Sequence, residues 1–300
     1  MSATRTLARA GLIVTSAFLV SRILGYVRVV VIGTTFGADS ELDTFFAAFR
    51  IPDLIFQLVA AGAVSSALIP VVSSLLAGDE RARAWRVVST VANLMLVGLA
   101  VLAVLVFVWA PLIVPAITPG FSQDQIARTV ELTRTMLLSP IFLALGAIAT
   151  SVLNSEGRFA ASAAAPITYN LAIIAAALFL APSMGVEGLA VGVVLGSVAH
   201  LAIQLRPLAR LGFRYQPRVD VADGEATHAL ALMAPRAIGL GASQITFVAM
   251  TYFASALAVG SLSAFNFAMT LLQIPLGVIG VPLGIVILPT LSRDLATGAV

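Results

Sequence analysis

Long apolar stretches alternate with short polar breaks along the whole chain. A helix needs about 20 mostly apolar residues to cross the hydrocarbon core of a bilayer. Each break carries glycine, proline, serine or charged residues, which favour turns. The eight apolar segments are 8–34, 42–76, 86–113, 125–153, 160–181, 187–209, 227–258 and 262–292. The pattern therefore predicts an all-α polytopic membrane protein.

The composition agrees with this prediction and excludes several function classes. Of the 300 residues, 60% are hydrophobic and 10% are charged, whereas a soluble domain has about 25% charged residues. The chain has no cysteine and only two histidines, so we expect no disulfide and no metal site. It also lacks a GxxxxGK phosphate loop and a nucleophile paired with a base. We therefore expect neither an enzyme nor a bound cofactor.

The arginines predict the topology, because cytoplasmic loops of membrane proteins are enriched in cations. One set of alternate loops holds only Arg128. The opposite set, which includes both tails, holds Arg5, Arg9, Arg81, Arg83, Arg86, Arg158, Arg206, Arg210, Arg214, Arg218 and Arg293. The excess of cations therefore indicates loop topology rather than nucleic-acid binding, and it places the N-terminus in the cytoplasm.

The end of the chain repeats the pattern of its beginning. A shift of 223 positions aligns Gly37 with Gly260, Ser40 with Ser263, Asp43 with Asn266, and Ile51-Pro52 with Ile274-Pro275. Parallel repeats of this kind are common in transporters. We therefore predict a six-helix N-terminal lobe at 1–215 and the first two helices of a second lobe at 216–300. Two helices cannot close a bundle, so the repeat predicts a longer chain of at least roughly 450 residues.

Five arginines lie within the predicted helices: Arg22, Arg28, Arg50, Arg134 and Arg236. A charge at the bilayer centre costs about 2.5–3.5 kcal/mol on insertion scales, so such residues usually face the protein interior. Arginines near helix ends can instead extend to the lipid headgroups, and this alternative stays open for each of them. Arg50 and Asp53 lie one helical turn apart, a spacing at which they can pair.

Three acids, Asp39, Glu41 and Asp43, cluster between the first two predicted helices. Acids are favoured at a helix N-terminus, so the cluster predicts helix capping, with a gate or an ion site as the alternative.

Several stretches resemble the MurJ/MviN family of lipid II flippases, which belongs to the multidrug/oligosaccharidyl-lipid/polysaccharide exporter superfamily. They are spread in the family's order over nearly the whole chain. They are SRILGYVR (21–28), FGADSELDTFFAAFRIPD (36–53), TPGF (118–121), VLNSEGRF (152–159), APITYN (165–170) and PLGVIGVPLGIVILPTLS (275–292).

The resemblance implies two six-helix lobes around a central cavity. It also implies alternating access that carries the lipid-linked peptidoglycan precursor outward across the bacterial cytoplasmic membrane. In the family, arginines that match Arg22 and Arg28 are functionally important, and an aspartate that matches Asp43 lies near the outer end of the second helix. The partners implied are this lipid-linked diphosphate, membrane lipids and cell-wall synthesis proteins, with no nucleic acid and a monomeric state.

The chain departs from the family at several positions where a charge is common. Phe56 and Thr270 stand where the family has arginines, Gln57 replaces a cation, and Ala61 and Gln273 replace acids. Arg236 is a candidate substitute cation. The predicted substrate-binding residues are Arg22, Arg28, Arg50, Arg236 and Asp43. Two other functions stay open: export of another anionic lipid-linked glycan or drug, and a cell-wall scaffold that does not transport.

Arg22 and Arg28 suit a diphosphate because a planar guanidinium binds phosphate oxygens through paired hydrogen bonds. Six residues of ideal helix separate them by about 9 Å in rise and about 120° in direction. We therefore expect the two arginines to contact different parts of the path rather than one phosphate.

Overall fold

The computed structural model describes residues 2–59, 63–220 and 222–275, and the regular elements of this part of the chain are all helices. They are α1 (Ser2–Phe36), α2 (Ser40–Val59), α3 (Ala63–Ala77), α4 (Arg81–Ile117), α5 (Gln123–Met136), α6 (Leu138–Ser155), α7 (Phe159–Phe179), α8 (Ala181–Met184), α9 (Val186–Arg210), α10 (Gly224–Ser255) and α11 (Ser261–Pro275).

Seven of the predicted segments match helices to within a few residues, but two of them are broken. Segment 42–76 forms α2 and α3, and segment 125–153 forms α5 and α6. The second break lies next to Pro140, which is in the first turn of α6, where its missing N–H removes no hydrogen bond within the helix. The eighth segment forms α11 as far as Pro275, and its remainder lies outside the described residues.

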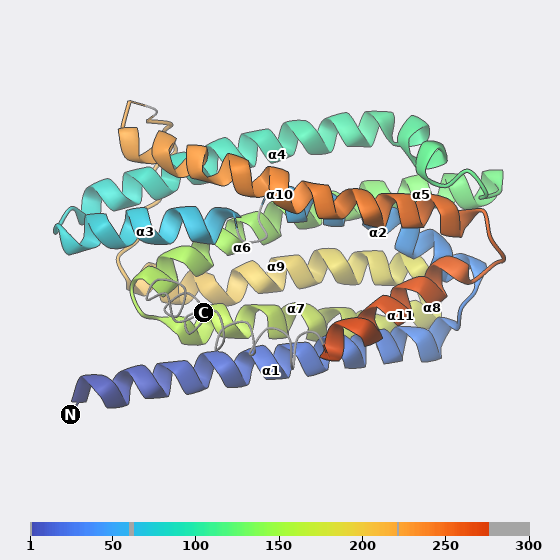
Figure 1. The fold of residues 1–300 in the computed structure, drawn as a ribbon, viewed down its shortest axis with the longest axis horizontal. Coiled ribbons are helices and arrows are strands. Elements are labelled where there is room, and N and C mark those ends of the chain that lie inside the picture. Colours follow the sequence, from blue (N-terminus) through green and yellow to red (C-terminus); the bar gives the residue numbers. More distant parts are fainter. Residues whose placement is uncertain (1, 60–62, 221, 276–300) are drawn as a thin grey trace, which may run out of the picture.

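Six stretches of the described chain are long and apolar enough to cross a membrane: α1 from Thr15, α4, α5 with α6, α7, α9 and α10. The pair α2–α3 follows the same path from one end of the bundle to the other (Figure 1). The chain is thus a multi-pass helical membrane protein.

The connections between helices gather at two opposite ends of the bundle (Figure 1). The N-terminus and the α3–α4, α6–α7 and α9–α10 connections lie at one end, which we call the N-terminal end. The α1–α2, α4–α5 and α10–α11 connections lie at the other end together with α8, and we call it the distal end. Arg81, Arg158 and Arg214 belong to the N-terminal end, whereas Arg128 of α5 lies near the distal end.

Close packing of small residues holds the first lobe together. Helix α7 packs along α1 on one side and along α9 on the other. Gly192 of α9 is buried against Ala176 of α7, and a Cβ at Gly192 would overlap the Ala176 methyl group. Glycine is therefore required for this approach of the two helices. Gly188 and Gly196 of α9 are in similarly close contact with the segment that includes α7.

Helix α10 begins on the first lobe and packs along α4, α3 and α2. The segment before it is bonded to α4: Asn93 Nδ2 donates to the Gln216 and Arg218 carbonyls at 3.0 and 2.8 Å. At the start of α10, Arg83 donates two hydrogen bonds to the Asp223 carboxylate, at 2.9 and 3.1 Å. The first turn of α10 is therefore held by polar contacts to α4.

The Asp223–Arg83 pair predicts a pH-dependent stability. Hydrogen bonding to Arg83 lowers the pKa of Asp223, against the opposing effect of burial. This contribution to stability is complete above the unfolded pKa, about 4, and is lost as the pH falls through the lower folded pKa. Asp223→Asn keeps the helix cap but loses the charge. We expect it to lower the Tm at pH 7, with the gap to wild type closing below about pH 4.

Thermal unfolding in detergent between pH 7 and pH 3 measures this gap. Asp124→Asn is the matched control, because Asp124 is exposed. A gap of constant size over this pH range would contradict the role given to the Asp223 charge.

The topology predicts which positions an impermeant thiol reagent reaches in intact cells. The chain has no cysteine of its own, so single cysteines can be introduced cleanly. Ser183 at the distal end and Ala222 at the N-terminal end are both exposed. We expect Ser183→Cys to be labelled from outside and Ala222→Cys only after permeabilisation. Labelling in the reverse order would overturn the arginine-based orientation.

Candidate functional site

A buried arginine of α2 joins the first lobe to α10 and α11. The Arg50 side chain is buried, with 7% of the residue exposed. Its Nε donates to Thr251 Oγ1 of α10 at 3.2 Å, and its Nη2 donates to Asn266 Oδ1 of α11 at 3.3 Å. Its guanidinium also lies 5.2 Å from the ring centroid of Phe247. Arg50 thus contacts both helices that begin the predicted second lobe.

Asp53 supplies the counter-charge one turn along α2. Its Oδ2 lies 3.9 Å from Arg50 Nη1, which confirms that the two residues pair within the helix. A buried cation is costly unless it is paired and hydrogen-bonded. Arg50 meets that requirement by pairing with Asp53 of its own helix and by donating hydrogen bonds to Thr251 of α10 and Asn266 of α11.

The arginines of α1 face different partners. Arg28 is half-buried, its guanidinium lies 6.0 Å from the Tyr169 ring centroid, and it is near enough to Asp53 to interact electrostatically. Arg22 is exposed, and its guanidinium lies 5.1 Å from the ring of Phe18 on its own helix. Arg22 has no ion pair within the described residues. The two arginines therefore diverge, as their spacing predicts.

Asp43 caps a helix other than its own. Its Oδ2 accepts from the Gly260 amide at 2.7 Å, and its Oδ1 accepts from the amide and hydroxyl of Ser263 at 2.8 and 2.6 Å. Asp43 is only 4% exposed. Free amides and the helix dipole at the start of α11 favour a carboxylate there. The start of α2 is capped instead by Asp39, which accepts from the Leu42 amide at 2.9 Å. We call the Asp43–Gly260–Ser263 contact the distal cap.

Gly260 makes the close approach at the distal cap possible. Its φ of +86° lies in the left-handed region, and a Cβ there would overlap the Ala38 carbonyl oxygen. Gly37, its partner in the predicted repeat, also has a positive φ of 71°. Both glycines thus have a positive φ in the connections that precede α2 and α11.

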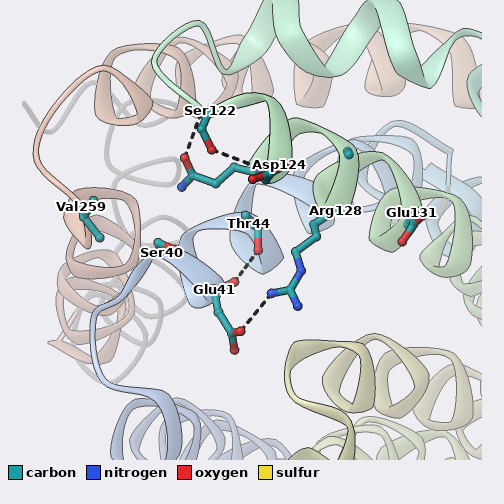
Figure 2. Close-up of a pocket in the computed structure, with 10 residues that line it drawn as sticks. Ser40, Glu41, Thr44, Ser122, Asp124, Arg128, Glu131 and Val259 are labelled. Carbon is teal, nitrogen blue, oxygen red and sulfur yellow. Dashed lines mark hydrogen bonds and ion pairs between the residues drawn. The ribbon is translucent and has the colours of Figure 1, made fainter.

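An open pocket of about 750 Å³ lies at the distal end beside this contact (Figure 2). It lies between the start of α2 and α5, with Val259 of the α10–α11 connection on its rim. Arg128 of α5 reaches across and donates to Glu41 Oε1 at 2.9 Å. Both side chains are nearly half exposed, so the pair orients the rim and contributes little to stability.

Thr270, Phe56 and Gln57 add no charge to this group. Thr270 donates its hydroxyl to the Asn266 carbonyl of its own helix at 2.9 Å, and Phe56 packs against the apolar core. Gln57 lies beside Asp53. Arg236 is on α10, but its side chain lies outside the described part of the structure. In the part that is described, no group of three or more His, Asp or Glu could hold a metal ion.

The sequence reasoning missed the residues that receive Arg50 and Asp43. These are Thr251, Phe247, Asn266 and Ser263, all polar or aromatic residues within apolar helices. The repeat held part of the signal, because it aligned Asp43 with Asn266 and Ser40 with Ser263. It gave no indication that Asp43 contacts α11.

The family model described as Lipid II flippase MurJ matches residues 32–299. The chain belongs to this family. It is 32% identical over 293 residues to the lipid II flippase MurJ of Burkholderia cenocepacia, covering 95% of this chain and 57% of the relative. It is likewise 32% identical to a probable lipid II flippase MurJ of Haemophilus influenzae, covering 92% and 56%. The chain thus spans somewhat more than half the length of these relatives.

Solved structures agree with the family. A lipid II flippase MurJ in an inward closed conformation superposes with a TM-score of 0.79 at 25% identity, covering 95% of this chain and 59% of that one. The MATE multidrug transporter DinF-BH superposes with a TM-score of 0.69 at 16% identity, covering 91% and 61%. The second likeness shows a shared fold. The family is one of membrane transporters and not of enzymes.

The distal cap predicts a large effect of removing one carboxylate. Hydrogen bonds to a charged group contribute about 1.5–3 kcal/mol each, so Asp43→Ala should cost at least about 2 kcal/mol. We expect a lower Tm and faster amide hydrogen exchange in the peptide that covers the start of α11. Hydrogen-exchange mass spectrometry of the purified protein measures the second effect.

Glu131→Gln is the control for this experiment, because Glu131 is an exposed acid on the rim of the same pocket. Unchanged protection of α11 in Asp43→Ala would show that the cap does not hold this helix.

Proposed function

We propose that the protein acts in the translocation of lipid II, a lipid-linked diphosphate, across the bacterial cytoplasmic membrane by alternating access. The proposal rests on the match of residues 32–299 to the family model described as Lipid II flippase MurJ. The relatives named as flippases are longer than this chain, so the activity of the whole protein is part of the proposal. We place its N-terminus in the cytoplasm on the strength of the arginine distribution.

Arg28 and Arg22 are the proposed contacts for the diphosphate. Arg28 lies beside the Tyr169 ring and interacts electrostatically with Asp53, which is paired with Arg50, and Arg28 forms no ion pair of its own within the described residues. Arg22 has no acidic partner among the described residues. Incompletely paired guanidinium groups at membrane depth gain most from a phosphate that supplies the missing negative charge. Arg236 stays a candidate third contact.

We assign Arg50 and Asp43 to a gate rather than to direct substrate contact. Both are buried, and Arg50 bonds to α10 and α11 whereas Asp43 bonds to the start of α11. For the distal end to open, Arg50 must leave Thr251 and Asn266, and Asp43 must leave the start of α11. Such bistable polar contacts are a usual basis for switching between two conformations.

The absence of charge at Phe56 and Thr270 favours a second candidate, another lipid-linked glycan with a diphosphate. Binding measured by native mass spectrometry for lipid II, a different diphosphate-linked glycan and the uncharged polyprenol separates these cases. A preference for lipid II supports the main proposal, equal binding of the two diphosphates supports the second, and equal binding of the polyprenol contradicts both.

Complementation tests the function directly. The protein is expressed in a bacterium depleted of its own flippase, and the appearance of lipid II on the outer face is measured. We expect rescue by wild type and a reduction of at least tenfold with Arg28→Ala, because the paired contact to phosphate is lost. Arg28→Lys should retain part of the activity, since it keeps the charge without the planar fork.

Membrane abundance and Tm are measured for each variant, with Arg158→Ala as a control at an exposed arginine of a loop. No rescue by wild type would contradict the flippase proposal. Full rescue by Arg28→Ala would show that transport does not depend on Arg28 and would contradict its role as a contact for the diphosphate.

A further inference from the structure

An apolar groove of about 270 Å³ opens between α4, α6 and α9. It lies in the half of these helices next to the N-terminal end, because the residues that line it come from the start of α4 and the ends of α6 and α9. Val88 of α4, Ile148 of α6 and Leu205 of α9 are representative of its walls. Asn93 is the one amide among the apolar and aromatic residues of this lining.

The segment after α9 closes one end of this groove and is fixed in place. The Tyr215 hydroxyl donates to Asn93 Oδ1 at 2.5 Å, and the Gln216 amide donates to Ser89 Oγ at 3.1 Å. Phe213 meets the Trp85 ring edge-to-face, with centroids 5.4 Å apart. The polar atoms of Asn93 are used by these contacts, so the groove offers an apolar surface to its occupant.

The groove is continuous with a surface that faces lipid. Large apolar side chains beside it are exposed: Val97 by 60%, Leu205 by 51% and Leu96 by 38%. Helices α4 and α9 are both membrane-spanning candidates. A Trp, a Phe and a Tyr gather at its closed end, and aromatic side chains of this kind sit at the headgroup level of a bilayer. The groove therefore fits an acyl chain whose headgroup lies at Tyr215.

Four arginines lie at the end of α9 and in the segment that closes the groove: Arg206, Arg210, Arg214 and Arg218. All four are exposed, and none forms an ion pair within the residues that the structure describes. Arg214 lies between Phe213 and Tyr215, which both line the groove. Basic clusters at the membrane surface attract anionic lipid headgroups.

We propose that this groove binds one anionic phospholipid of the surrounding leaflet. An acyl chain lies along α4, α6 and α9, and the phosphate is bound by Arg214 and Arg210. The site lies outside the charged group around Arg28 and Arg50, and it does not depend on the transport function. Its effect is to attach the segment between the two lobes to the lipid surface.

The two tryptophans of the chain, Trp85 and Trp109, make the proposal testable by quenching with brominated lipid. Trp85 is buried against Phe213 at the groove, whereas Trp109 is 50% exposed near the other end of α4. Trp109→Phe leaves Trp85 as the reporter of the groove, and Trp85→Phe leaves Trp109 as the reporter of bulk lipid. The purified protein is placed in phosphatidylcholine nanodiscs that contain a minor fraction of brominated phosphatidylglycerol or brominated phosphatidylcholine.

We expect Trp85 to be quenched more strongly by brominated phosphatidylglycerol than by brominated phosphatidylcholine, and Trp109 to be quenched equally by both. Each arginine near a membrane surface changes the affinity for anionic lipid about fivefold, so Arg210→Gln with Arg214→Gln should weaken the preference at Trp85 by at least tenfold. Arg158→Gln, an exposed arginine at the same end of the bundle, should leave the preference unchanged.

Equal quenching of Trp85 by the two lipids would overturn the proposal, because bulk lipid alone would then fill the groove. A preference that survives in the double variant would also overturn it, since the arginines would then not bind the headgroup. An unchanged Tm of the double variant shows that a lost preference comes from lost binding and not from unfolding.

Discussion

The packing of α11 against α2 depends on one buried carboxylate. Asp43 is almost inaccessible to water and satisfies the amides at the start of α11, which would otherwise be unbonded. A buried charge is stable only when its hydrogen-bond partners are in place. Moving α11 away from α2 is therefore costly if Asp43 stays inaccessible to water. Separation of α2 from α11 must therefore admit water or new donors to Asp43. That requirement makes the distal end suited to two discrete states.

The contacts within the first lobe differ in kind from those at its boundary. Helices α7 and α9 meet through glycine and alanine, at a distance that leaves no room for a larger side chain. Helix α2 meets α10 and α11 through Arg50, Asp43 and their hydrogen-bonded partners. Apolar close packing is rigid, whereas hydrogen bonds can be exchanged for bonds to water or substrate at a small net cost. The contact between α7 and α9 is thus rigid, whereas the hydrogen bonds that join α2 to α10 and α11 can be broken and formed again.

The sequence predicted the features that depend on local physics. Hydropathy predicted where the helices lie, and the distribution of arginines predicted which connections share one end of the bundle. Helical geometry predicted that Arg22 and Arg28 point in different directions. The three-residue spacing of Arg50 and Asp53 also predicted their pairing. What it missed depends on contacts between distant segments: a capping acid was expected on its own helix, but Asp43 caps α11. No periodicity encodes that choice, because it follows from how the lobes pack. The break before α6 was missed because hydropathy continues unchanged across it.

We propose that the Asp43 carboxylate holds the distal end closed. Ser183 and Ala258 are both exposed and lie at the distal end, so each can carry a spin label. Pulsed electron–electron double resonance in nanodiscs then measures the distance between the two labels. With Asp43 intact the account predicts one narrow, short distance, and Asp43→Ala should shift much of the distribution to longer distances. The same narrow distribution in both proteins, with both folded, would show that the distal end stays closed without this carboxylate.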